Sequence, residues 1–573
     1  MSDTTHSFEQ HFLSLIARGS GLLPAEIRSL ISRLIEATVN QHSCIHLADE
    51  SNETLSSIME HKAFGGPNDK TPFVIRDDRL YLRRFYRFEV EVASMIAKRN
   101  EPISVPDSIV LKQKLDEHFG SESGNRQKLA ALLAISRKLA IVTGGPGTGK
   151  TSTVVKMLDI LLEESPDIDI RLAAPTGKAA MRLGDSIRDW ATDRSLDLEV
   201  QTLHRLLGMR RDGRTWRHGP RNPVDADLLI VDEASMIDLP MMHRLLSAIP
   251  EDSRLILLGD PNQLPSVDTG NVLADLCAGD SSFSLEFSNF AHPFVGEMPT
   301  TETTHRLTDA VCTLERSYRF DENSAIGKLA LGIQSASIKL DDSDTSVSWH
   351  SEAAPSKLLA NWQNYLAALE SGTVNADILN EAFEKTRILC SRRGGDSGVT
   401  ELNLAIEQLL ESRGLKGPGE TFYTGRPVLV TRNDYNLGLF NGDIGICTPL
   451  ANDEFVVRFP GKSEGILASR LPDHETCFAM TVHKAQGSEF DHVMLVLGSE
   501  SSEEASSLMT RELIYTAITR ARKNISVYAK ESTWQKALSR RSTRVSGMTH
   551  FLGIENPPGD DATSSDPGQR NLF

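Results

Sequence analysis

A glycine-rich stretch at residues 144–151 reads GGPGTGKT and satisfies the pattern GxxxxGK[ST]. It follows the apolar run LAIVT and precedes an amphipathic segment, which is the strand–loop–helix context of a phosphate-binding loop. Backbone N–H groups of such a loop wrap phosphates at a helix N-terminus, with Lys150 on the β- and γ-phosphates and Thr151 on Mg²⁺. The stretch predicts ATP binding by Gly144, Gly145, Pro146, Gly147, Thr148, Gly149, Lys150, Thr151 and Ser152.

Two further apolar runs end in polar residues that suit nucleotide hydrolysis. DLLIVDEAS (227–235) ends in paired carboxylates, of which Asp232 is expected to hold Mg²⁺ and Glu233 to polarise the attacking water. LILLGDPNQLPSV (255–267) places Gln263 shortly after a strand end, where it can sense the γ-phosphate. After a phosphate-binding loop, these carboxylates favour hydrolysis over a kinase or synthetase reaction.

The stretch YTAITRAR (515–522) carries two arginines near the end of a helix-like segment. An exposed basic helix face and an arginine aimed at a transferred phosphate are both compatible with these eight residues. The phosphate-binding loop supplies a target for one of the two.

Composition limits the function classes. The 573 residues are 39% hydrophobic and 24% charged, which is typical of a globular protein of several domains. The six cysteines form no CxxC pair, and the N-terminus MSDTTHSFEQ lacks a signal-peptide pattern, so we expect a cytoplasmic protein without a membrane span. The net charge of −17 argues against nucleic-acid binding through an overall positive field but leaves room for a local basic groove.

Apolar runs alternate with amphipathic segments in two regions, which indicates buried parallel sheets with helical crossovers. The first region includes LAIVTG, IRLAAPT (170–176), DLLIVDEAS and RLILLGD (254–260), and the second includes RILCS (387–391), HVMLVLG (492–498) and ISVYA (525–529). Between the latter runs, residues 421–470 have the short strands and turns of a small β-barrel. Residues 209–227 are interpreted as an inserted hairpin, and residues 281–305 as a loop.

The motifs resemble those of superfamily 1 helicases, and most of all the RecD-type helicases of superfamily 1B. The resemblance covers roughly residues 70–530, and the motifs appear in the family order. Besides the stretches above, it is carried by NRQK (125–128), AAPTGKAA (173–180), TLHRLLG (202–208), LERSYRF (314–320), SRRGGDSGVTELN (391–403), NDYNLGLFNGDIG (433–445) and AMTVHKAQGSEF (479–490).

The resemblance implies an α/β fold with two RecA-like P-loop motor domains, each with a parallel sheet. It predicts an N-terminal partner-docking α/β domain at residues 1–110 and a first motor domain at 111–335. A second motor domain follows at 336–550, with an SH3-like β insertion at about 415–472. The Pro/Gly/Asp/Ser-rich residues 551–573 are expected to form a disordered tail.

The resemblance also implies residue roles. Gln127 is expected to contact the adenine base and Glu489 the nucleotide, while Arg319 and Arg520 reach the γ-phosphate. Arg522 is left as a helix-end cation or a salt-bridge partner. Trp216 in the hairpin is equally compatible with a duplex-splitting wedge and with a plain surface hairpin. The expected DNA contacts are Pro175, Thr176, Thr202, His204, Asn403, Thr481 and His483.

The implied activity is ATP-dependent 5′→3′ translocation on single-stranded DNA and DNA unwinding. Within this family the chain looks most like the type that forms exodeoxyribonuclease V. The resemblance therefore implies RecB and RecC as partners and a role on double-strand ends in recombinational repair and degradation of linear DNA. No PD…(D/E)xK arrangement accompanies Glu60-His61-Lys62, so the nuclease site is expected in another subunit. The stand-alone RecD2 type has a long extension before its phosphate loop, whereas 143 residues precede Gly144 here. A nucleotide-gated regulatory subunit that binds DNA ends without translocating is the alternative.

Overall fold

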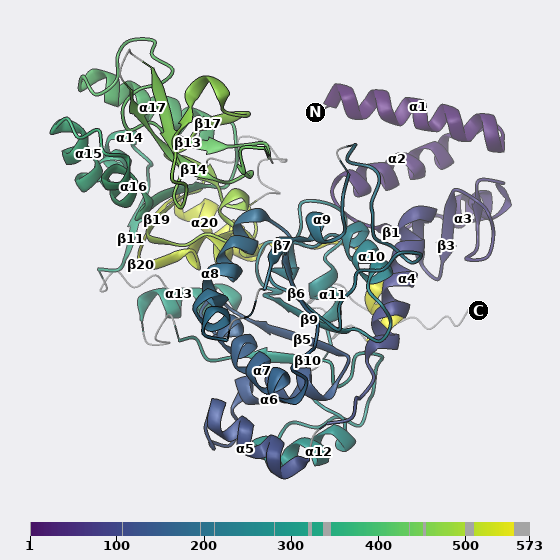
Figure 1. Ribbon diagram of the computed structural model, residues 1–573. Helices are drawn as coiled ribbons and strands as arrows, with labels where there is room; N and C mark the ends of the chain where they lie inside the picture. The colour runs from purple at the N-terminus through teal and green to yellow at the C-terminus, as the bar shows by residue number, and fades with distance from the viewer. Residues whose placement is uncertain are drawn as a thin grey trace.

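The computed structural model describes residues 2–554 except 106, 195, 197, 211, 280, 319–323, 336–337, 339–344, 435, 451–453 and 499–508. The described residues contain four β-sheets. In Figure 1 the first motor sheet lies at the centre, with the N-terminal domain on one side and the second motor sheet on the other. Among the described helices, none has the length and apolar character needed to cross a membrane.

The N-terminal domain is a mixed sheet covered by helices, as expected. Ile27, Leu30 and Leu34 recur at helical spacing and are buried, which gives α2 its apolar face. A turn at Asp77–Asp78 joins an antiparallel pair, with Asp77 at a φ of 54°. The sheet order is β1-β4-β3-β2. The elements are α1 (Ser2–Ser20), α2 (Ala25–Val39), β1 (Cys44–His46), α3 (Asn52–Glu60), β2 (Phe64–Gly65), β3 (Phe73–Arg76), β4 (Arg79–Leu82) and α4 (Arg83–Arg99).

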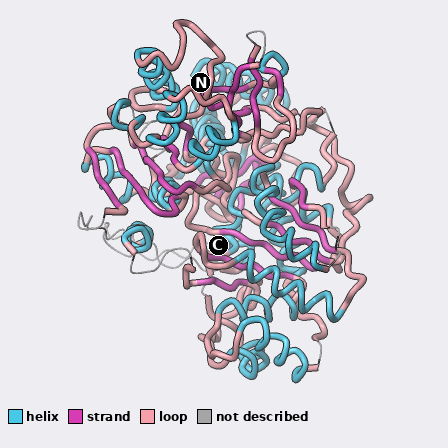
Figure 2. Tube along the Cα trace, turned by 60° about the vertical axis from the view of Figure 1, so that its left-hand side comes forward, coloured by secondary structure: helices cyan, strands magenta, loops and turns pink. Residues whose placement is uncertain are grey.

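The first motor domain is built on a parallel sheet of order β10-β5-β9-β8-β6-β7. Helices flank its strands on both sides (Figure 2). Helices α6 and α7 pack on one face of the sheet, and α4 and α10 pack on the other. Its elements are α5 (Ser108–Phe119), α6 (Arg126–Ser136), β5 (Leu139–Gly144), α7 (Lys150–Glu164), β6 (Ile170–Ala174), α8 (Gly177–Asp193), β7 (Val200–Thr202), α9 (Leu203–Leu206), β8 (Leu228–Val231), η1 (Ala234–Met236), α10 (Leu239–Ala248), β9 (Arg254–Gly259), α11 (Val272–Leu276), α12 (Leu285–Val295) and β10 (Val311–Leu314).

The second motor domain has a parallel sheet of order β11-β20-β19-β12-β18. Its elements are α13 (Ala325–Gln334), β11 (Val347–His350), α14 (Pro355–Leu359), α15 (Gln363–Glu370), α16 (Ala376–Glu384), β12 (Thr386–Cys390), α17 (Val399–Ser412), β18 (Ala479–Thr481), η3 (His483–Ala485), β19 (Phe490–Val496), α19 (Arg511–Ile518), β20 (Ala521–Tyr528) and α20 (Glu531–Ser539). Helix α13 falls within the predicted first motor domain, but its buried Ile326 and Ile333 pack in the core of the second.

The predicted β insertion is an antiparallel sheet of order β16-β15-β14-β13-β17 with its own apolar core. In the described residues its strands pair only with one another. Short strands separated by turns are therefore recognisable in this stretch of the sequence. The elements are β13 (Pro427–Val430), β14 (Ile444–Pro449), β15 (Phe455–Arg458), β16 (Ile466–Leu467), η2 (Ala468–Arg470) and β17 (His474–Thr476).

The interpretation of residues 281–305 as a loop is wrong for its central part, which forms α12. Ser284 caps this helix by accepting a hydrogen bond from the Phe287 amide. Phe287, Ala291 and Phe294 follow at helical spacing and are buried in the core beneath α5 and α6. Pro293 suggested a break, but the helix continues through it for two more residues.

The chain ends by returning to the N-terminal domain, through residues 540–554, which we call the C-terminal strap. Ser43 N donates to Val545 O at 3.1 Å and Gly547 N donates to a Glu89 carboxylate oxygen at 3.0 Å. Helix α21 (Met548–Leu552) packs on α4 (Figure 1). Residues 551–554 were predicted to begin the disordered tail, but Leu552 and Ile554 are buried. Residues 555–573 of that tail lie outside the described residues.

Candidate nucleotide and DNA sites

The phosphate-binding loop connects β5 to α7 at the carboxyl edge of the first motor sheet. Gly149 precedes α7 at a φ of 82°, and a Cβ there would collide with the Gln127 side chain, so the position requires glycine. The Lys150 ammonium donates to the carbonyl oxygens of Gly144 at 2.6 Å and Gly145 at 3.1 Å, which holds it over the loop. Gln127 donates to Thr148 O at 3.1 Å and therefore lies against the same loop.

The two carboxylates after β8 lie next to this loop. Asp232 Oδ1 accepts the Glu233 amide at 2.8 Å, and Glu233 has a φ of 52°, which is strained for a residue other than glycine. Burial, with the Glu233 charge beside it, raises the pKa of Asp232 to about 6, while Lys150 and Arg182 oppose that rise. A partly buried carboxylate pair near a lysine is suited to hold a cation.

Residues of the second motor domain contact this site directly. Arg520 is only 2% exposed, and its guanidinium donates to Gln263 Oε1 at 2.5 Å. Tyr515 Oη donates to Asp260 Oδ2 at 3.1 Å. The same hydroxyl lies so close to the loop that a Cβ at Gly145 would stand 2.9 Å from it. Arg520 and Tyr515 therefore meet the phosphate loop and the strand-end residues across the domain boundary.

Arg522 has a different environment from Arg520. Helix α19 ends at Ile518, so Arg522 lies in β20 and the helix-end interpretation is wrong. Its Nε donates to Glu489 Oε2 at 3.1 Å, which is the salt-bridge alternative. Glu489 also forms an ion pair with Arg182 of α8, on the opposite side of the cleft.

The segment that holds Arg319 can be followed only in part. Arg319 lies outside the described residues. Before it, the Tyr318 amide donates to Gly147 O at 2.7 Å, so the segment runs against the phosphate loop. Glu315 forms an ion pair with Arg126 at 3.0 Å. Arg126 is the first residue of α6, next to Gln127, which is predicted to contact the adenine base.

Three of the four predicted DNA contacts of the first motor domain line a cavity of about 200 Å³. Pro175, Thr176 and His204 line it together with Gln486 of the second motor domain. Thr176 and Thr202 also cap α8 and α9, each accepting a backbone amide at 3.2 Å. Burial lowers the pKa of His204, which favours its neutral form.

The second motor domain contributes Thr481 and His483, at the end of β18 and the start of η3. Thr481 Oγ1 accepts the Lys484 amide at 3.3 Å. Burial, together with the nearby Arg544 charge, lowers the pKa of His483. Both hydroxyl and neutral imidazole can donate to a phosphate oxygen.

Asn403 does not fit its predicted DNA contact. Its amide nitrogen donates to Thr476 O at 2.9 Å and Ala479 O at 3.0 Å. Its oxygen accepts from the amides of Phe478 at 3.0 Å and Ala479 at 2.8 Å. Because Asn403 is buried and all of its hydrogen-bonding groups are used, it fixes α17 to β18 instead.

The inserted hairpin is present, and its tryptophan is held at its base. Met209 pairs with Trp216, and Arg210 N donates to Thr215 O at 2.9 Å. The Trp216 ring stacks on His204 at a centroid distance of 5.7 Å, and the Arg244 guanidinium lies 4.6 Å from the ring centroid. The wedge and plain-hairpin interpretations both remain open, but the exposed tip is at 212–214.

Sequence reasoning did not single out Arg182, Tyr515 or Gln486. Arg182 stands two residues beyond AAPTGKAA, and Tyr515 opens YTAITRAR, so both lie beside recognised motifs. Gln486 donates to Leu264 O at 3.0 Å across the domain boundary. These contacts join residues more than two hundred positions apart, and no local pattern indicates them.

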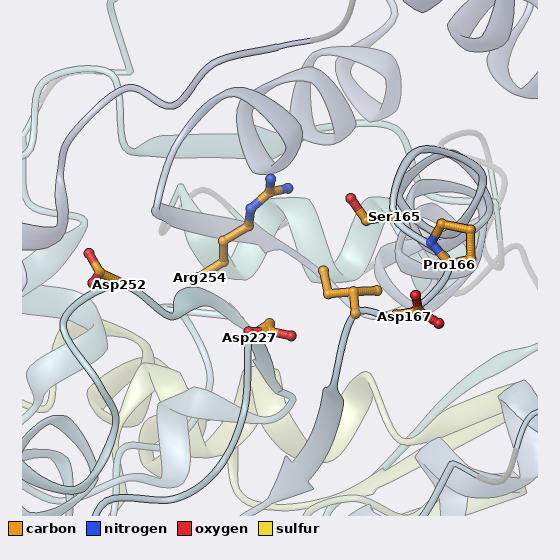
Figure 3. Close-up of a pocket in the computed structure, with 7 residues that line it drawn as sticks. Ser165, Pro166, Asp167, Asp227, Asp252 and Arg254 are labelled. Atoms are coloured by element: carbon orange, nitrogen blue, oxygen red, sulfur yellow. The ribbon is translucent and has the colours of Figure 1, made fainter.

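A second cavity, of about 430 Å³, lies away from the nucleotide site (Figure 3). Arg254 and Asp227 stand at the amino ends of β9 and β8, and Asp167 precedes β6. Ligands of parallel α/β sheets bind at the carboxyl ends of the strands, where the phosphate loop is. This cavity is therefore on the opposite edge from the site.

Comparison with known proteins agrees with this geometry. Models of the AAA domain, of the ATP-dependent RecD-like DNA helicase SH3 domain and of the UvrD-like helicase C-terminal domain match residues 127–269, 402–459 and 476–528. The RecBCD enzyme subunit RecD of Haemophilus influenzae is 34% identical over 539 residues, covering 85% of this chain and 82% of that protein. The chain belongs to the RecD family of ATP-dependent DNA helicases.

Two further relatives separate the types within the RecD family. The RecBCD enzyme subunit RecD of Mycobacterium tuberculosis is 36% identical, and the match covers 82% of this chain and 80% of the relative. The ATP-dependent RecD2 DNA helicase of Deinococcus radiodurans is 30% identical, but the match covers only 57% of it. These two RecBCD subunits are more identical to the chain than this RecD2 helicase is, and the match covers more of each of them.

Proposed function

We propose that this RecD-family helicase is a 5′→3′ single-stranded DNA translocase that hydrolyses ATP between its two motor domains. The observation that carries the proposal is the hydrogen bond from Arg520 of the second domain to Gln263 of the first, beside the phosphate loop. A charge that stabilises the transition state from the opposite domain acts only when the cleft is closed. Hydrolysis is therefore linked to domain closure.

In this mechanism the first motor domain binds the nucleotide and the second completes the site. Lys150 and the loop amides bind the phosphates, and Gln127 reads the adenine. Glu233 accepts a proton from the attacking water, and Gln263 orients that water. Arg520 and Arg319 stabilise the charge on the transferred phosphate, while Glu489 contacts the nucleotide.

The donor set beside the loop fits Mg²⁺, because Thr151 offers a hydroxyl oxygen and Asp232 a carboxylate oxygen, the ligands that this ion prefers. The partly buried Asp232 also has a raised pKa that a nearby cation would lower. We propose that these two residues hold Mg²⁺, which screens the phosphate charge when bound.

The DNA side uses contacts that carry no sequence information. Thr176, Thr202 and His204 on the first domain and Thr481 and His483 on the second donate to backbone phosphates. Pro175 shapes the cavity wall. Because one set moves relative to the other as the cleft closes and opens, each ATP cycle shifts the grip along the strand.

The relatives named RecBCD enzyme subunit RecD support an assignment to the same kind of assembly. We propose RecB and RecC as partners, double-strand DNA ends as substrate in repair and recombination, and a nuclease site in another subunit. The N-terminal domain, which lies to one side of both motor domains, is the proposed docking element (Figure 1). Co-purification with the companion subunits tests this assignment, and a chain that stays alone would contradict it.

A nucleotide-gated regulatory subunit without translocation is the alternative. DNA-stimulated ATP hydrolysis by the wild type and by Lys150→Gln separates the two functions. The motor predicts turnover that rises with single-stranded DNA and is lost in Lys150→Gln, whereas turnover indifferent to DNA would contradict it. Duplexes with 5′ or 3′ overhangs test polarity, because unwinding only from 3′ tails is incompatible with the proposed direction.

A further inference from the structure

We propose that Arg182 is a positioning residue that transmits DNA binding to the nucleotide cleft through helix α8. The proposal rests on the DNA-stimulated ATPase proposed above and goes beyond it, because it assigns the path of communication. Two observations carry it, namely the place where α8 begins and the partners of Arg182.

Helix α8 begins at the DNA side. Thr176 lines the cavity with His204 and caps the helix through the Ala179 amide. Gly177 approaches the SH3-like insertion so closely that a Cβ on it would stand 3.1 Å from Phe440 Cβ. A phosphate bound at Thr176 therefore acts on the first turn of α8, which is already held between the cavity and the insertion.

Arg182 projects from the same helix into the nucleotide cleft. It stands six positions after Thr176, which is about 9 Å along a helix axis at 1.5 Å per residue. Its guanidinium forms an ion pair with Glu489, whose side chain is only 5% exposed. Glu489 is in turn held by Arg522, so the pair joins α8 to the second motor domain.

The carboxylate pair of the first domain also acts on Arg182. Burial lowers the pKa of Arg182, and the charges of Glu233 and Asp232 oppose that effect. The guanidinium thus stands between Glu489 of the second domain and the carboxylates that serve hydrolysis in the first.

Helix α8 therefore contacts the DNA side at its first turn and the nucleotide cleft through Arg182. A packed helix moves as a rigid element, so a displacement of its first turn by a DNA phosphate also displaces Arg182. That displacement changes the field at Glu233 and the strength of the Arg182–Glu489 contact across the cleft. The binding of DNA at Thr176 thereby sets how readily the cleft between the motor domains closes and how fast ATP is hydrolysed in it.

The experiment measures ATP turnover of the full chain with and without oligo(dT). For Arg182→Ala we expect the stimulation factor to fall on the order of tenfold, within the roughly 5–150-fold range typical of energetic coupling between sites. The DNA-free rate and the affinity for oligo(dT), measured by fluorescence anisotropy, should change much less. Arg182→Lys keeps the charge and should restore part of the stimulation.

Arg188 supplies the matched control, because it lies on the same helix but is exposed and pairs with Asp185. Arg188→Ala should keep the wild-type stimulation factor. If the thermal midpoint shows that Arg182→Ala is unfolded, Arg182→Gln is measured in the same way.

The outcomes separate the inference from the proposed function. A wild-type chain whose turnover ignores oligo(dT) would refute the DNA-driven motor itself. A stimulated wild type would leave the motor intact. The inference on Arg182 is overturned if its variants lower the DNA-free and stimulated rates by the same factor, or if they change neither rate.

Discussion

Replacing Arg520 by alanine should abolish most ATP turnover while leaving ATP binding intact. The guanidinium donates to Gln263 Oε1 at 2.5 Å and to Thr516 O at 3.1 Å, and it is almost fully buried. Lys150 and the loop amides, which lie in the first motor domain, do not depend on it. The alanine variant therefore removes a contribution from the second domain only.

The magnitude follows from the environment of the two arginines. An arginine that stabilises transition-state charge across an interface contributes at least about 10³ in rate, which equals about 4 kcal/mol. Arg522 is 55% exposed and forms one ion pair with Glu489. A contact of that kind is worth about 0–1 kcal/mol after solvent screening, so Arg522→Ala should reduce turnover by no more than about fivefold.

The assay compares kcat at saturating oligo(dT) with the Kd for a fluorescent ATP analogue in both variants. Arg520→Lys distinguishes loss of charge from loss of the planar guanidinium geometry. The thermal midpoint checks folding, because the truncation leaves Gln263 and a backbone carbonyl without their donor. Equal losses of kcat in the two alanine variants, or loss of ATP binding in Arg520→Ala, would refute the division of roles between Arg520 and Arg522.

Three further predictions concern stability and the hairpin. Asn403→Ala removes four hydrogen bonds between the Asn403 side chain and the backbone, and should destabilise the fold by about 2–4 kcal/mol. Thermal unfolding measures this loss. A variant with normal stability and lost DNA affinity would contradict the structural role of Asn403. Burial raises the pKa of Glu89 from 4.5 to about 7, so its folded form retains a proton that the unfolded chain releases. Stability should therefore fall as pH rises from about 4.5 to 7, by on the order of 2–3 kcal/mol, and a Glu89→Gln variant with an undiminished pH dependence would refute this. Trp216→Ala should weaken binding of oligo(dT) through His204, whereas Arg214→Ala at the hairpin tip should reduce unwinding alone; the reverse pattern would favour Trp216 as the wedge.

Much of the nucleotide site is local in the sequence, and for that reason it was predictable. The phosphate loop needs a strand, glycines, Lys150 and a helix in immediate succession, and Asp232 and Glu233 directly follow a buried strand. Parallel sheets of this kind bring successive strand ends to one edge. The insertion was recognisable for a similar reason, since three of its four antiparallel strand pairs join strands that are consecutive in the chain.

The sequence led to wrong interpretations where the local composition favoured one structure and tertiary packing stabilised another. Pro293 and the polar residues around it favoured a loop at 281–305, but burial of Phe287 and Phe294 beneath α5 and α6 stabilises α12. Asn403 matched a DNA-contacting segment, yet backbone groups of Thr476, Phe478 and Ala479 take up all of its hydrogen bonds. Neither outcome depends on the residues within one segment alone.

The sequence by itself determined the loop, the carboxylates and the two parallel sheets, because each depends on neighbouring residues and on strand or helix periodicity. Tertiary structure alone decided that Arg520 is buried against Gln263, that Arg522 faces Glu489 and that Arg182 reaches the same carboxylate from the other domain. These contacts form only where the two motor domains meet. Spacing along the chain carries no information on which side chains then face each other.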